Sequence, residues 1–146
     1  MVEPPVMKEA IVEGRRLVER ARAKGLPIAV AGWFRVGENG PPELYVATPD
    51  EWIYGPRPII RLLRETLQET GATSFDLADV RVVDASTHFV NGAMNAGGDP
   101  TRERVIGPQL VGGRFVERAF VYACDPSATP SPMPPGSRRP HEADAA

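Results

Sequence analysis

The residues best suited to chemistry stand together in the segment Asp84-Ala85-Ser86-Thr87-His88. An acid, a hydroxyl and an imidazole at alternate positions are the groups of a nucleophilic triad. In an extended segment, however, alternate side chains are about 7 Å apart, whereas a base must lie within about 3 Å of its nucleophile. A turn at Ser86 would bring them together, but Asp84 and Ser86 would then cap a following short helix. We therefore predict capping, with His88 as general base beside Asp84 as the alternative.

A metal site is a second possibility for this segment. Asp84, His88 and Asp99 could bind a divalent ion, but such scattered ligands are a weak pattern. Cys124 is the only cysteine, which excludes a thiolate zinc site and an internal disulfide. A lone histidine beside an aromatic residue is more often a packing residue, so we predict no metal and no cofactor.

A glycine- and asparagine-rich stretch, residues 91–98, follows directly, with two arginines behind it. Such loops can bind phosphate groups with their backbone amides, although this spacing matches neither the Walker motif nor the dinucleotide fingerprint. Long loops in compact domains are often functional. The candidate ligands for an anionic group are Asn91, Asn95, Arg102 and Arg104, beside the simpler interpretation that the loop is flexible.

A second candidate anion site lies at the start of a helix predicted over residues 58–70. Arg57, Arg61 and Arg64 would line one side of it. Arg57 and Arg61 would also lie near the free amides of its first turn, where anions bind. Glu65 would be placed to pair with Arg61. A solvated helix face is favoured, and Arg57 and Arg61 stay as candidate ligands.

The segment before that helix, residues 48–56, carries Trp52, Ile53 and Tyr54 between prolines. This is more apolar surface than a connection needs. The aromatic residues could cover an open end of the core, or they could present a patch to another protein, since Trp and Tyr are frequent interface anchors. Both interpretations stay open, and Trp52 and Tyr54 are the best interface candidates.

Hydrophobic periodicity predicts the elements that must position these residues. Helical spacing predicts helices, and period-two alternation with glycine turns at Asn39-Gly40 and Gly112-Gly113 predicts two hairpins. Pro108 predicts an edge position or a bulge. The predicted elements are a helix over 6–24, strands over 27–37 and 43–48, the helix over 58–70, a strand over 79–85, a short helix within 89–94, and strands over 104–111 and 114–124.

This order, α-β-β-α-β-(α)-β-β, predicts an α+β fold. Because hairpins dominate, we expect a two-layer sandwich with a mainly antiparallel sheet and helices on one face. The length of 146 residues, with 42% hydrophobic and 25% charged residues, is typical of one soluble domain. We predict a single α+β domain over residues 1–124.

Residues 125–146 contain six prolines and one large apolar side chain, Met133. Such a segment cannot bury enough apolar surface to offset its ordering entropy, which predicts a disordered proline-rich tail. Its part over residues 129–135 is polyproline-like and could dock in a groove.

Charge and hydropathy exclude several classes of function. The net charge of −2 is evenly spread, which makes nucleic-acid binding an unfavoured role. No apolar run reaches the ~20 residues of a membrane-spanning helix, and the N-terminus lacks a signal-peptide core. We expect a cytoplasmic protein, and the excess of arginine over lysine suggests a GC-rich bacterial gene.

Two hypotheses follow. The favoured one is a non-catalytic accessory or protein-interaction domain in a homo- or hetero-oligomeric assembly, using Trp52, Tyr54, a sheet edge near Pro108 and the tail. The alternative is a small enzyme or anionic-ligand-binding domain, with its site around Asp84–His88 and the Asn91–Arg104 loop. The first is favoured because no catalytic set converges in the sequence.

Overall fold

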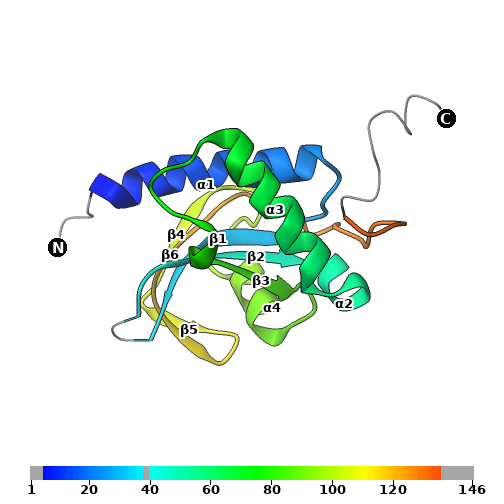
Figure 1. The fold of residues 1–146 in the computed structure, drawn as a ribbon. Coiled ribbons are helices and arrows are strands. Elements are labelled where there is room, and N and C mark those ends of the chain that lie inside the picture. Colours follow the sequence, from blue (N-terminus) through cyan, green and yellow to red (C-terminus); the bar gives the residue numbers. More distant parts are fainter. Residues whose placement is uncertain (1–4, 38–39, 136–146) are drawn as a thin grey trace.

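Six strands form one mixed sheet in the computed structural model, which describes residues 5–37 and 40–135 (Figure 1). The helices are α1 (Pro5–Ala23), α2 (Asp50–Tyr54), α3 (Pro56–Thr70) and α4 (His88–Asn95), with a 3-10 helix, η1, at Leu77–Asp79. The strands are β1 (Val30–Val36), β2 (Glu43–Thr48), β3 (Val80–Asp84), β4 (Arg104–Ile106), β5 (Gln109–Val111) and β6 (Arg114–Val121).

The strand order is β3-β2-β1-β6-β4, and β5 also pairs with β6. All pairs are antiparallel except β2 with β3, which confirms the mainly antiparallel α+β fold. The strand predicted over 104–111 is divided into β4 and β5 at the cis bond between Gly107 and Pro108. The predicted turn at Asn39-Gly40 lies partly outside the described residues.

The two long helices cover one face of the sheet, as the apolar stripes of α1 and α3 predict. α3 begins after Gly55 with Pro56 in its first turn, and it ends at Gly71, whose left-handed conformation (φ 68°) closes the helix. The core between these helices and the sheet contains Leu17, Val18, Ala21, Trp33, Leu44, Val46, Ile59, Leu62, Leu63 and Tyr122.

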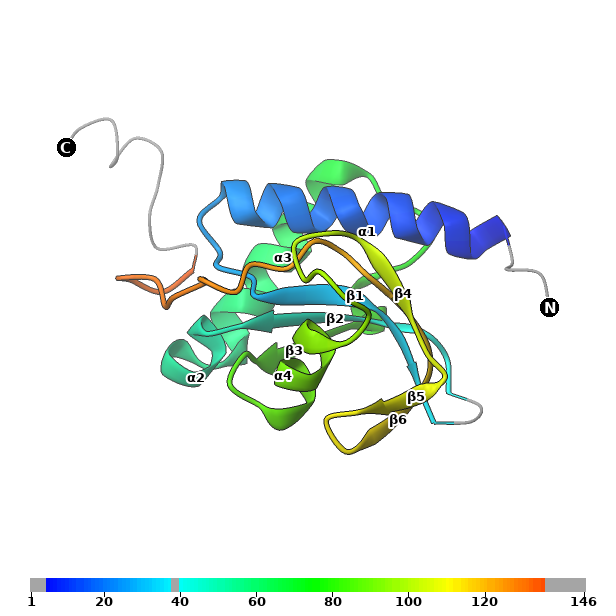
Figure 2. The ribbon, with the colours of Figure 1, turned by 180° about the vertical axis from the view of Figure 1, so that it is seen from behind.

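The short helix α4 packs on the opposite face (Figure 2). Phe89, Val90 and Ala93 are buried on its inner side. Phe89 meets Phe34 and Tyr45 of the sheet with ring centroids 5.4 and 5.5 Å apart. The two-layer α+β fold is confirmed by α1 and α3, whereas α4, which we expected on the same face as the other helices, packs on the opposite face.

The segment after β6 contacts α2 through Ser131. Residues 125–135, here called the strap, are described and lie beside α2 (Figures 1 and 2), whereas the rest of the predicted tail, 136–146, lies outside the described residues. In the described part of the chain, no helix combines the length and apolar character needed to cross a membrane.

Candidate functional site

Two of the segments singled out in the sequence begin at the same end of the sheet. β2 and β3 run parallel, and Thr48 lies opposite Asp84 where both strands end. The backbone N–H of Ala85 donates to the carbonyl of Thr48 at 3.3 Å. α2 therefore follows one strand, and the Asp84–His88 turn follows its neighbour. The carboxyl ends of parallel strands are a frequent place for binding sites in proteins.

The Asp84–His88 segment forms a turn and not a triad. The Asp84 carboxylate accepts hydrogen bonds from the N–H and the hydroxyl of Ser86. The N-cap of α4 is Thr87, whose hydroxyl accepts from the N–H of Val90 at 3.4 Å, rather than the predicted Asp84 or Ser86. The imidazole of His88 is exposed and makes no hydrogen bond with a described residue. Among residues 5–37 and 40–135, no three His, Cys, Asp or Glu side chains gather as a metal site would need.

The candidate anion ligands after this turn have different environments. Asn91 and Asn95 are exposed on α4, where the amide of Asn95 donates to the carbonyl of Asn91 at 2.9 Å. Arg102 is exposed in the following turn. Arg104 is only 9% exposed. These four residues therefore do not converge on one ligand-sized space.

Arg104 has a structural role in the described molecule. Its guanidinium donates to the carbonyls of Ala93, Met94 and Ala96 at 2.7, 3.1 and 2.6 Å. These carbonyls lie at the C-terminal end of α4, where they lack backbone donors. The Arg104 guanidinium supplies donors to them, and its positive charge is stabilised by the negative end of the helix dipole. The inward direction follows from strand alternation, because Arg104 shares the buried face of β4 with Ile106.

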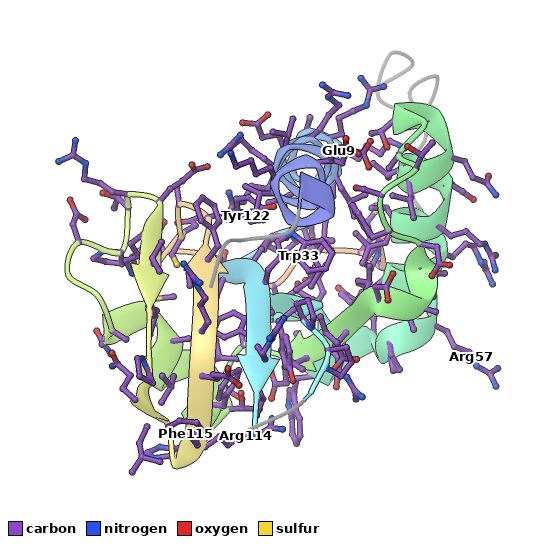
Figure 3. The ribbon with its side chains drawn as sticks, turned by 90° about the vertical axis from the view of Figure 1, so that its left-hand side faces the viewer. Glu9, Trp33, Arg57, Arg114, Phe115 and Tyr122 are labelled. Carbon is purple, nitrogen blue, oxygen red and sulfur yellow. The ribbon has the colours of Figure 1, made fainter. Side chains whose placement is uncertain are left out.

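Arg57 and Arg61 lie on α3, on the opposite side of the sheet from α4, so the two candidate anion sites do not merge. Both side chains are exposed and make no hydrogen bond or ion pair with a described residue. The expected pair between Arg61 and Glu65 is not among the ion pairs of the described residues. Arg57 projects into solvent from the lower end of α3 (Figure 3).

The segment with the aromatic residues contains the short helix α2, which presents apolar side chains to solvent. Trp52 is 78% exposed and Ile53 is 52% exposed. Trp52 therefore does not close an end of the core, and the interface interpretation gains weight. Tyr54 is partly buried, and its hydroxyl donates to the carbonyl of Ser131 in the strap.

Asp50, the first residue of α2, is fully buried and was missed in the sequence. Its Oδ1 accepts the backbone N–H of Ser131 at 2.7 Å, and its own N–H donates to the hydroxyl of Thr48 at 3.1 Å. Its Oδ2 is buried and has no partner among the described residues. No local pattern could have found this contact, because Asp50 and Ser131 are 81 positions apart.

We call Asp50, Trp52, Ile53, Tyr54 and Arg57 the α2 corner. It combines a buried acceptor, a partly buried hydroxyl donor, two exposed apolar side chains and a cation that has no ion pair with a described residue. This set can bind polar backbone and apolar side chains of another segment, but it contains no nucleophile with an adjacent base. No protein-family model, curated protein or solved structure matches this chain, so the argument for function rests on this geometry.

Proposed function

We propose that this chain is a non-catalytic protein-interaction domain, an accessory component of a homo- or hetero-oligomeric assembly, that binds its partner through the α2 corner. The observation that carries the proposal is the 78% exposure of Trp52. A tryptophan side chain buries roughly 200 Å² of surface on full burial. Removing the exposed part of Trp52 from water would contribute about 4 kcal/mol before the costs of association.

The α2 corner presents Trp52 in a fixed position. A helix of five residues would not form alone, but α2 is held by the buried Asp50 beneath it and is followed directly by α3. A partner would therefore lose little free energy in ordering this surface. Trp, Tyr and Arg are the residues most enriched at interface hot spots, and all three occur here within six positions, from Trp52 to Arg57.

The test compares two exposed apolar side chains on different elements. Wild-type protein, Trp52→Ala and Leu110→Ala would each be used to capture partners from native lysate and would be examined by sedimentation velocity. Leu110 is 70% exposed on β5, away from the α2 corner, and serves as the matched control. We expect Trp52→Ala to reduce recovery or self-association at least tenfold, and Leu110→Ala to leave both unchanged. Equal recovery and equal self-association for all three proteins would contradict the proposal.

A further inference from the structure

The N–H, the carbonyl and the hydroxyl of Ser131 each make a hydrogen bond to another part of the domain. Its N–H donates to the Oδ1 of Asp50, its carbonyl accepts from the hydroxyl of Tyr54, and its own hydroxyl lies 3.4 Å from the carbonyl of Gly25. Asp50 and Tyr54 therefore hold both sides of one backbone unit. We call these two side chains the clamp.

The prolines on both sides of Ser131 make this contact selective. Proline has no backbone N–H, so Ser131 carries the only N–H of the run Pro130-Ser131-Pro132. Within the strap, the N–H and the carbonyl of Ser131 are directed to the domain, where Asp50 and Tyr54 bind them. An acceptor placed like Asp50 therefore sets the register of a Pro-x-Pro segment with one hydrogen bond.

The strap uses only part of the site on which it lies. The clamp is occupied, yet Trp52 and Ile53 are still 78% and 52% exposed, and the Oδ2 of Asp50 has no partner. Arg57, in the first turn of the adjoining helix α3, makes no ion pair with a described residue. A segment with the same backbone, an apolar flank and an acidic residue would satisfy the clamp, cover Trp52 and Ile53, and pair with Arg57.

We propose that the clamp is a binding site for a Pro-x-Pro segment of a partner protein, and that the strap of this chain occupies the site as a built-in competitor. The proposal rests on the proposed function, for which it specifies the ligand chemistry. A tethered segment competes at an effective concentration on the order of millimolar. The apparent affinity for a partner is therefore the intrinsic affinity of the clamp multiplied by the fraction of molecules in which the strap has left it.

The test uses a fluorescent peptide with the sequence of residues 126–135 and measures its anisotropy with the full-length chain. Ser131→Pro removes the N–H that Asp50 accepts, and it should release the strap. Ser131→Ala keeps the N–H and the carbonyl and is the matched control. We expect Ser131→Pro to bind the peptide at least tenfold more tightly than wild type or Ser131→Ala. Adding Tyr54→Phe to Ser131→Pro should remove most of this gain.

A peptide with proline in place of Ser131 keeps the test independent of protein folding. It should fail to bind the Ser131→Pro chain, because it lacks the N–H donor. Equal binding of both peptides, or equal binding of the natural peptide to all three chains, would overturn the clamp. A wild-type dimer that Ser131→Pro converts to monomer would show that the occupant is the strap of a second copy, which would overturn the proposal of a separate partner.

The two proposals fail in distinguishable ways. If Trp52→Ala loses its partner while Ser131→Pro gains no peptide binding, the interaction domain stands without the clamp. If Ser131→Pro gains peptide binding while Trp52→Ala keeps every association, the clamp stands and the Trp52 surface is not the interface.

Discussion

The indole Nε1 of Trp33 donates a hydrogen bond to the hydroxyl of Tyr122 at 3.0 Å, and this hydroxyl donates in turn to the carbonyl of Ile11 at 2.6 Å. The chain of contacts joins β1, the end of β6 and α1 inside the core, beneath α1 (Figure 3). Burial raises the pKa of the Tyr122 hydroxyl, although the hydrogen bond from Trp33 acts in the opposite direction, so the phenol stays neutral and keeps its donor. The close approach of α1 to these rings requires a small residue on the helix.

Gly14→Ala should destabilise the domain. A Cβ at Gly14 would lie 2.5 Å from the Tyr122 hydroxyl and 2.8 Å from the Trp33 Nε1. Overpacking of this kind costs about 1–3 kcal/mol, which exceeds the gain of up to about 1 kcal/mol from replacing glycine in a helix. We expect a net loss of about 1–2 kcal/mol in the free energy of unfolding, measured by urea denaturation.

Tyr122→Phe provides the control for that loss, because it removes the nearest clashing atom. In a double-mutant cycle, Gly14→Ala should cost less in the Tyr122→Phe background than in the wild type. Val12→Ala, on the exposed side of the same helix, should change stability by less than about 0.5 kcal/mol. Strictly additive effects would show that the hydroxyl does not limit the approach of α1.

Arg104→Ala should destabilise the domain by about 3 kcal/mol, since it leaves the carbonyls of Ala93, Met94 and Ala96 without their charged donor. Arg104→Lys should recover less than half, because a single ammonium cannot span these carbonyls. Chemical denaturation measures the loss, and hydrogen exchange of residues 96–102 should accelerate. Arg102→Ala, at an exposed position, is the control and should change stability by less than about 0.5 kcal/mol. Equal losses for both alanine variants would contradict the assigned role.

Glu13 should make the stability of the domain depend on pH in the acid range. Burial alone would raise its pKa, but hydrogen bonds from Ser74 and Thr73 outweigh burial and hold the pKa of Glu13 below its usual value. A lowered pKa stabilises the fold above the unfolded value of about 4.3, and this stabilisation is lost as the pH falls through the folded value.

Glu13→Gln should therefore cost at most about 1 kcal/mol near neutral pH, because solvent screens this partly exposed carboxylate, and the cost should shrink as the pH falls through the folded pKa. Urea denaturation at several pH values measures this difference. Glu9→Gln, at an exposed position of the same helix, should leave the pH dependence unchanged. A difference between Glu13→Gln and wild type that does not vary with pH would refute the assignment.

The long elements could be predicted from sequence because their signals are local. The helix predicted over 6–24 is α1, and the helix predicted over 58–70 is α3, which begins two residues earlier at Pro56. The final hairpin with its turn at Gly112-Gly113 is present as β5 and β6. Each follows from periodicity and from glycine or proline at its ends.

The candidate site was only partly predictable. Trp52 and Tyr54 were named for their residue types, but the sequence left open whether they cover the core or face solvent. Asp50 and Ser131 carry no local signal, because one is an ordinary first-turn residue of a short helix and the other lies in a proline-rich segment. Their importance depends on a contact between distant parts of the chain.

The sequence by itself determined the fold class, the hairpins, the helix ends and the residue types that could serve an interface, because these depend on neighbours a few positions apart. Only the tertiary structure decided that β2 and β3 pair in parallel, that Arg104 is directed inward, that Trp52 faces solvent and that Ser131 lies on Asp50. These outcomes depend on which surfaces meet when the chain closes on itself. Local periodicity cannot predict these contacts, because the residues that make each contact are separated along the chain and are brought together only by packing of the sheet.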